Sequence, residues 1–128
     1  IRLSGPIAPL MIDGPLDGAM FLEWTRRFLV PELREGDVVI LDNLRTHRVA
    51  GFEEMVESAG SRVLYLPPYS PDFNPIEPMW SKVKSFLRGV EARSYQALLK
   101  TLAKALTLVT EADCMGFFRH SGYVYTAR

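Results

Sequence analysis

A β-branched and apolar run, VVIL at residues 38–41, leads directly into an acidic residue, Asp42. Such a run is typical of a strand in a parallel sheet that is buried on both faces. A second run of this kind, RVLYL, occupies residues 62–66. Between the two runs, apolar residues recur at helical spacing from Val49 to Ala59, and Gly60 stands where a C′ glycine would end a helix. We therefore expect a strand, helix, strand unit with parallel neighbouring strands and a right-handed crossover.

Upstream of this unit the sequence indicates a hairpin and a helix. Residues 1–3 have the character of the end of a strand, Ser4 and Gly5 mark a turn, and a second strand is expected from about Ile7 to Ile12. Asp17 is a suitable N-cap for the helix that follows. The stripe expected to face the core of that helix consists of Phe21, Trp24, Thr25 and Phe28.

Downstream, a proline-rich connection is followed by three predicted helices. The first has its apolar residues at Ile76, Met79, Trp80, Val83, Phe86 and Leu87, which is the strongest helical periodicity in the chain. Ser94 is expected to cap the second helix, and Thr110 to precede a short third one. The element order predicts an α/β fold, with a mixed sheet flanked by helices and with further helices at the C-terminal end.

Length and composition predict one globular domain. The chain has 128 residues, 48% of them hydrophobic, and no apolar stretch approaches the ~18 residues that a membrane span needs. It begins at Ile1 without a methionine, which suggests a piece of a longer protein. The single cysteine, Cys114, cannot form an internal disulfide, so we expect a core residue and a reducing cytoplasm.

Charge is balanced overall but not along the chain. Residues 1–60 hold six Lys/Arg and ten Asp/Glu, whereas residues 61–128 hold nine and five. A run of six bases between residues 82 and 104 comprises Lys82, Lys84, Arg88, Arg93, Lys100 and Lys104. Such a run is either a solvated helix face or a surface that follows a phosphate backbone, and both interpretations stay open.

Two acidic residues carry the chemical interpretation, and 34 residues separate them. Asp42 ends its strand, where open α/β sheets gather ligands, and Glu77 falls in the first turn of the following helix. Each has a purely structural alternative: Asp42 as a turn residue, and Glu77 as the partner of Asn74 in a capping box with Pro75 at N1. As a pair, two carboxylates on one rim can share a divalent cation and support phosphoryl transfer.

The motifs around these acids resemble those of the DDE transposases of the mariner-related bacterial insertion-sequence branch. The first motif is Asp42-Asn43 at a strand end, with His47 a few residues on. The second is the segment Pro67-Pro68-Tyr69-Ser70-Pro71, and the third is Asn74-Pro75-Ile76-Glu77 followed by Trp80. The resemblance extends across nearly the whole chain, which would correspond to the C-terminal portion of such a protein.

The resemblance implies a ribonuclease-H-like catalytic domain in which three carboxylates hold two Mg²⁺ or Mn²⁺ ions. Asp42 would be the second carboxylate and Glu77 the third, and both would bind metal. Asn43 and His47 would support these ligands or contact DNA. The alternative for His47 is that it is a surface residue at the start of a helix. Lys84 corresponds to a basic residue that such helices carry further along.

One part of the family pattern is missing from this sequence. The first, central strand with its carboxylate is expected upstream of Ile1, together with a DNA-reading helix-turn-helix region, so residues 1–128 are expected to be a partial catalytic domain. Asp13 and Asp17 cannot replace that carboxylate, because the strand ending near Asp13 would lie roughly 14 Å from the Asp42 strand at ~4.8 Å per strand step. Two-metal chemistry requires ions only ~4 Å apart. Both residues are therefore interpreted as turn and cap residues.

The resemblance implies metal-dependent DNA cleavage and strand transfer by a cut-and-paste transposase, with transposon ends and target DNA as partners. It implies a bacterial cytoplasmic, nucleoid-associated protein with no membrane contact. The alternative is a non-catalytic, truncated remnant that serves only for interaction or oligomerisation, as a homodimer or with a missing N-terminal portion. Tyr69 and Trp80 are expected to pack rather than stack on bases.

Overall fold

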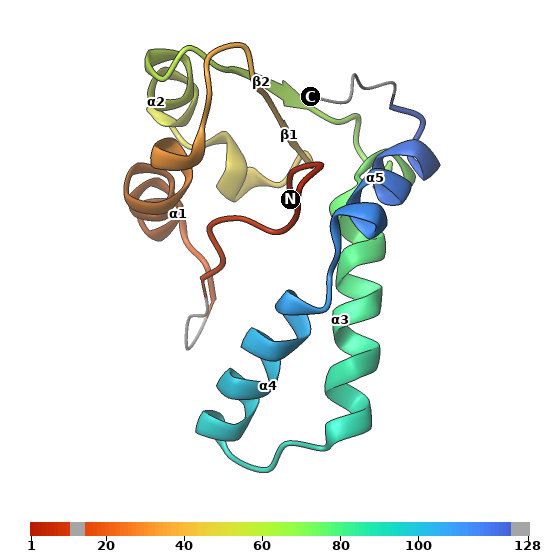
Figure 1. The fold of residues 1–128 in the computed structure, drawn as a ribbon. Helices are drawn as coiled ribbons and strands as arrows, with labels where there is room; N and C mark the ends of the chain where they lie inside the picture. The colour runs from red at the N-terminus through yellow and green to blue at the C-terminus, as the bar shows by residue number, and fades with distance from the viewer. Residues whose placement is uncertain (11–14, 124–128) are drawn as a thin grey trace. The chain divides into compact units, whose positions relative to one another are not determined.

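The computed structural model describes residues 1–10 and 15–123, which divide into two compact units (Figure 1). One unit, here the sheet unit, spans Ile7–Pro71. The other, here the helical unit, combines Ile1–Pro6 with Asp72–Arg128. Each unit has its own cluster of buried apolar side chains, and each is described by itself.

The sheet unit contains the predicted strand, helix, strand unit. Strand β1 (Val38–Leu41) pairs in parallel with β2 (Arg62–Tyr65), and the register runs from Val38 opposite Arg62 to Leu41 opposite Tyr65. Helix α2 (Phe52–Ser58) lies between them in sequence, and its C-cap Ala59 is followed by Gly60, whose φ of 82° confirms the predicted C′ glycine. The helix begins later than expected because Gly51, with a φ of 97°, interrupts the chain before Phe52.

The two strands are not buried on both faces, so that part of the prediction was wrong. Val39, Leu41 and Val63 pack against the core of the sheet unit, which is built on Phe21, Leu29, Phe52 and Val56. Side chains alternate along a strand, so Val38 and Leu64 belong to the opposite face. They are 42% and 47% exposed. The sheet unit therefore presents an apolar sheet face that a parallel sheet normally covers.

Helix α1 (Gly18–Trp24) begins as predicted, because Oδ1 of Asp17 accepts a hydrogen bond from the Met20 N–H at 2.8 Å. It continues into a π-helical turn, η1 (Thr25–Leu29), in which the Val30 N–H bonds the Thr25 carbonyl, and then into a 3₁₀ turn, η2 (Val30–Glu32). The π turn adds one residue to the repeat. It therefore buries Leu29 in place of Phe28, which is 42% exposed instead of facing the core.

The predicted upstream strands do not form within the described residues. Residues 1–6 make only an isolated antiparallel bridge between Arg2 and Gly5, and residues 7–10 are irregular. The sheet within the described residues therefore has β1 and β2 alone instead of a larger mixed sheet. The remainder of the predicted strand, Met11 and Ile12, and the predicted turn residue Asp13 lie outside the described residues.

The helical unit consists of α3 (Ile76–Val90), α4 (Tyr95–Thr107) and α5 (Glu111–His120) (Figure 1). Its buried core is formed by Met79, Val83, Ala105, Val109 and Cys114. Cys114 is fully buried, as predicted for a core residue. Among residues 1–10 and 15–123, no helix combines the length and the apolar character needed to cross a membrane.

The caps of the last two helices are those that the sequence predicts. Ser94 accepts a hydrogen bond from the Ala97 N–H at 3.0 Å. Thr110 and Asp113 form a reciprocal capping box at the start of α5. The start of α3 differs from the prediction. Pro75 is its N-cap, and the side chain of Asn74 accepts from the Ile76 N–H at 3.3 Å without a capping-box bond to Glu77.

Candidate active site

Asp42 lies directly after β1, at the carboxyl end of the parallel pair, and its side chain is 41% exposed. The Leu44 N–H donates a hydrogen bond to Oδ1 at 3.3 Å, which is the turn contact expected of an acid at this position. The Nδ1 atom of His47 lies 2.6 Å from the same oxygen. Within the described residues, Oδ2 of Asp42 has no polar contact, so this oxygen is open to a ligand.

His47 is held beside Asp42 by its surroundings. It belongs to a 3₁₀ turn, η3 (Arg45–Arg48), and its side chain is only 18% exposed. Its ring lies 4.9 Å from the ring of Phe21, a core residue of the sheet unit. The contact of Nδ1 with Asp42 is close enough for an ion pair but lacks the alignment of a hydrogen bond. His47 is therefore a partly buried neighbour of the carboxylate within a short 3₁₀ turn.

Asn43 contacts Arg48 and, through it, is linked to Tyr65; sequence reasoning singled out neither of these two residues. The Arg48 Nε–H donates to Oδ1 of Asn43, and the Arg48 guanidinium lies 4.4 Å from the centre of the Tyr65 ring. The Tyr65 hydroxyl donates to the backbone carbonyl of His47 at 2.8 Å. The available signal was the parallel register, because Tyr65 pairs with Leu41, immediately before Asp42.

The electrostatics around Tyr65 favour a neutral phenol. Burial raises the pKa of Tyr65, and the nearby carboxylate of Glu53 raises it further, while Arg48 acts in the opposite direction. The hydroxyl therefore remains protonated, and able to donate, throughout the neutral pH range.

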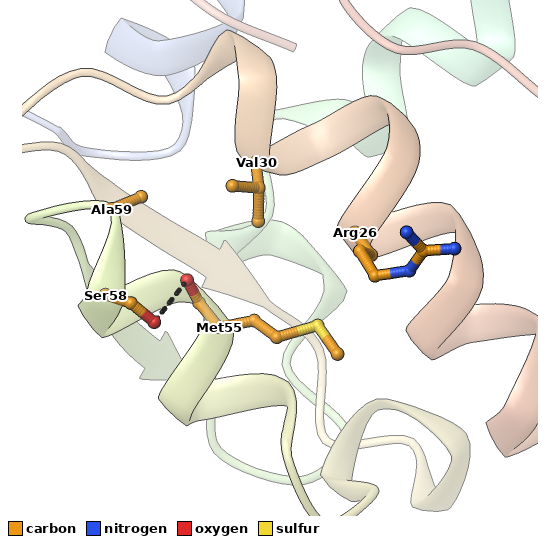
Figure 2. Close-up of a pocket in the computed structure, with 5 residues that line it drawn as sticks. All are labelled: Arg26, Val30, Met55, Ser58 and Ala59. Carbon is orange, nitrogen blue, oxygen red and sulfur yellow. Dashed lines mark hydrogen bonds between the residues drawn. The ribbon is translucent and has the colours of Figure 1, made fainter.

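Two hollows in the sheet unit differ in chemistry. One, of about 260 Å³, is lined by Arg48, Val49, Ala50, Gly51, Glu53, Glu54 and Tyr65. The other, of about 200 Å³, lies between η1 and α2 and is shown in Figure 2, lined by Arg26, Val30, Met55, Ser58 and Ala59. The second hollow has no carboxylate or imidazole in its lining, whereas the first has Glu53 and Glu54.

Glu77 lies in the first turn of α3, in the helical unit, and its side chain is exposed. Because the predicted capping box does not form, helix capping does not occupy this carboxylate. Lys84 lies seven residues further along, so it shares the same side of the helix, and it too is exposed. Neither side chain has a polar contact within the part of the chain that the structure describes.

The predicted site residues are thus divided between the two units. The sheet unit brings together Asp42, Asn43 and His47, whereas the helical unit carries Glu77 and Lys84. Outside residues 11–14 and 124–128, no group of three or more His, Cys, Asp or Glu side chains is assembled to hold a metal ion. The donor chemistry fits a hard divalent cation, because carboxylate oxygens are the ligands that Mg²⁺ and Mn²⁺ prefer.

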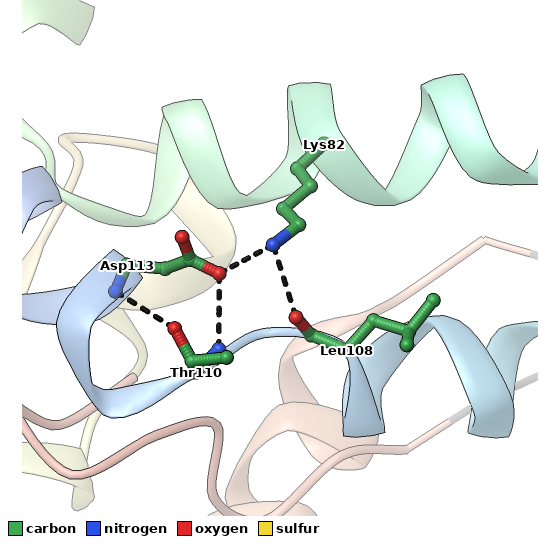
Figure 3. A network of polar contacts seen from close by, with 4 residues as sticks. All are labelled: Lys82, Leu108, Thr110 and Asp113. Atoms are coloured by element: carbon green, nitrogen blue, oxygen red, sulfur yellow. Dashed lines mark hydrogen bonds and ion pairs between the residues drawn. The ribbon is translucent and has the colours of Figure 1, made fainter.

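The basic run of the helical unit is partly structural. Figure 3 shows Lys82 donating to the Leu108 carbonyl at 3.0 Å and to the carboxylate of Asp113, which also accepts from the Thr110 N–H at 3.0 Å. The hydrogen bond from Lys82 is the largest cause that lowers the pKa of Asp113, and the bond from the Thr110 N–H lowers it further. All six bases of the run are exposed, but Lys82 is engaged in joining α3 to the ends of α4 and α5.

The proline-rich segment differs from the expectation that its tyrosine packs. Tyr69 is fully exposed and has a positive φ of 57°. Trp80 is 37% exposed on α3, so it packs only in part.

Comparison with known proteins gives one finding on the family. Residues 1–99 match the model of the family described as DDE superfamily endonuclease. The match covers well over half of the chain and includes both Asp42 and Glu77. No curated protein matches the chain.

Proposed function

Because the chain belongs to the DDE superfamily of endonucleases, we propose that it is part of the catalytic domain of a cut-and-paste DNA transposase. The branch that its motifs resemble is the mariner-related bacterial insertion-sequence group, whose catalytic domain is ribonuclease-H-like. The reaction is metal-dependent cleavage of DNA strands and their transfer to a target. The observation that carries the proposal is Asp42 at the carboxyl end of β1, with its contacts on Oδ1 and with Oδ2 open.

In this proposal Asp42 and Glu77 hold the catalytic cation together, as two of the three carboxylates that the resemblance implies. When bound, a Mg²⁺ or Mn²⁺ ion supplies Lewis acidity at the phosphodiester and lowers the pKa of a bound water. Oδ2 of Asp42 is the ligand atom that its surroundings leave available. His47 lies beside the other oxygen, where it would limit the directions in which the carboxylate can point.

Two further residues have supporting roles, one in binding DNA and one in holding the loop after β1. Lys84 extends from the same side of α3 as Glu77, and it would contact the DNA backbone next to the reacting phosphate. Asn43 keeps the loop after β1 in place through Arg48. The other five bases of the run fit the role of a surface that follows phosphates, and Lys82 is excluded because Asp113 and Leu108 engage it.

Calorimetric titration of Mn²⁺ into the chain tests the proposal. We expect weak binding that Asp42→Asn and Glu77→Gln each reduce by more than about 10-fold, the size of loss seen when even a supporting residue is disturbed. The matched control is Glu57→Gln, which removes the same charge from an exposed position on α2. Equal Mn²⁺ affinity in all four proteins would contradict the assignment, as would tight binding of two ions by monomeric chain.

The exposed apolar sheet face supports a second candidate, an interaction or oligomerisation role without catalysis. Val38 and Leu64 are 42% and 47% exposed on adjacent strands, where a parallel sheet is normally covered. Sedimentation analysis distinguishes this role. Association that Leu64→Lys abolishes, in a chain that binds no Mn²⁺, would favour the interaction role over the catalytic one.

A further inference from the structure

Tyr65 lies at the end of β2, beside the start of the loop that carries Asp42. It is the last residue of β2 and lies opposite Leu41, the residue before Asp42. Its hydroxyl donates to the His47 carbonyl at 2.8 Å, across eighteen positions of sequence. The contact therefore ties the end of one strand to the turn that follows the other.

The turn that it holds has little support of its own. The η3 turn has no side-chain cap, and the Leu44 carbonyl accepts from the His47 N–H at 3.0 Å. The hydrogen-bond geometry of a short 3₁₀ turn is poorer than that of an α-helix, so such a turn holds a side chain less firmly by itself. The distance between His47 and Asp42 therefore depends on contacts from outside the turn, which include the Phe21 ring and the Tyr65 hydroxyl.

Tyr65 also supports the other side of the carboxylate. The guanidinium of Arg48 lies over its ring at 4.4 Å and donates to Asn43, the residue after Asp42. The ring is thus a platform for Arg48, while the hydroxyl holds His47. Both neighbours of Asp42 in the candidate site are connected to the same tyrosine.

We propose that Tyr65 is a positioning residue for the Asp42 and His47 pair, acting through the His47 carbonyl and, by way of Arg48, through Asn43. The inference rests on the proposed function, since it names residues that orient a carboxylate toward a cation. Supporting residues of this kind commonly change metal affinity by about 10- to 100-fold when they are removed.

The surroundings of Arg48 favour this role over direct binding of DNA. The hollow beside Arg48 and Tyr65 is also lined by Glu53 and Glu54. Two carboxylates at this place repel a phosphate, whereas they are compatible with an arginine that is engaged on an aromatic ring and an amide. Arg48 is therefore assigned to the support of the loop.

The test uses the imidazole signals of the full chain, which has only two histidines, His47 and His120. Tyr65→Phe removes the hydroxyl and keeps the ring that carries Arg48. In metal-free protein at a fixed pH, we expect the His47 carbon-bound proton signal to shift while that of His120 stays in place. Tyr95→Phe is the matched control, because Tyr95 is half exposed at the start of α4, in the helical unit.

A second variant keeps the test informative if the first is poorly folded. Arg48→Met removes the link to Asn43 and leaves the Tyr65 hydroxyl, so we expect a smaller shift of His47 and weaker Mn²⁺ binding. In Tyr65→Phe, Mn²⁺ affinity should fall by about 10-fold. His47 signals that are identical in Tyr65→Phe, Arg48→Met and the unaltered chain would overturn the inference.

The outcomes separate the two proposals. If His47 shifts in Tyr65→Phe and Mn²⁺ binds neither protein, the positioning of His47 by Tyr65 stands while the proposed metal site fails. If Mn²⁺ binds the unaltered chain and Tyr65→Phe equally well, with His47 unmoved, the metal site stands and the positioning role fails.

Discussion

Asp42 ends a strand of the sheet unit and is held through Oδ1 by the Leu44 N–H and by His47, whereas Glu77 extends from the first turn of α3 with no polar contact within the described residues. Asp42 is moreover connected to a core, because His47 lies against Phe21, whose ring is also 4.9 Å from that of Phe52. Glu77 shares its helix with the core residues Met79 and Val83, but it lies on the exposed side.

The difference concerns how much each carboxylate is organised before a ligand arrives. Fixing a glutamate side chain in one rotamer costs up to ~2 kcal/mol of free energy, because rotamer entropy is lost. For Glu77 this loss occurs when the ligand binds. Asp42 has a shorter side chain and existing contacts, so less of that cost remains. Packing changes in the core of the sheet unit should therefore alter the position of the Asp42 carboxylate. Packing changes in the core of the helical unit should not alter the position of the Glu77 carboxylate in the same way.

The largest expected effect is that of Phe21→Ala. Phe21 is 3% exposed and contacts both Phe52 and His47, so its loss should lower the free energy of unfolding by about 3–5 kcal/mol. Denaturant titration measures that loss. In the folded fraction the His47 proton signal should also move, since the ring loses its neighbour.

The counterpart in the helical unit is Met79→Ala. Met79 is 2% exposed, and we expect a loss of about 2–5 kcal/mol. The His47 signal should remain unchanged under native conditions, because Met79 belongs to the other core. A shift of His47 as large as that in Phe21→Ala would show that the two carboxylates do not differ in their link to packing.

Lys82→Met should have a smaller effect, which depends on pH. The Lys82 contact with Asp113 is partly exposed, so its loss should cost about 1 kcal/mol or less. Because the pKa of Asp113 is lowered in the folded state, this stability is present above the ordinary value of 3.8 and is lost as the pH falls through the folded-state pKa. Thermal unfolding at neutral and acid pH should show the variant and the parent converging in acid.

The control for this change is Lys84→Met, on the same helix. Lys84 is exposed and has no polar contact within the described residues, so its replacement should change the free energy of unfolding by less than about 0.5 kcal/mol.

Mn²⁺ binding should be unaffected by Lys82→Met. If it fell as far as in Asp42→Asn, the polar network of the helical unit would belong to the metal site.

The smallest expected effect is that of Tyr69→Ala. Tyr69 is fully exposed, and alanine removes no packing, so the free energy of unfolding should change by less than about 0.5 kcal/mol. A loss above 1 kcal/mol in a denaturant titration would show that the proline-rich connection depends on this ring.

Local signals in the sequence predicted much of the fold. The runs at residues 38–41 and 62–65 form strands, and the caps at Asp17, Ser94 and Thr110 bond as expected. Each of these depends on a few neighbouring residues. The strand expected from Ile7 depends instead on long-range pairing, and its described residues have no such partner.

The candidate site shows the same division. Asp42, Asn43 and His47 lie within six residues of sequence, so one motif identified them, and the structure places them together. Tyr65 reaches the site only through the parallel register, and Arg48 only through the path of η3. The shift from Phe28 to Leu29 in the core follows from a π turn, which no simple periodicity anticipates.

The central claim, that Asp42 and Glu77 hold one cation, is tested most directly by paramagnetic broadening of backbone amide signals during titration with Mn²⁺. We expect the amides of residues 43–47 and of Ile76 and Glu77 to broaden over the same range of Mn²⁺ concentration. Asp42→Asn and Glu77→Gln should each weaken the broadening of both segments. If the segments broaden independently, so that Glu77→Gln leaves residues 43–47 unaffected, the two carboxylates do not share an ion and the account is wrong.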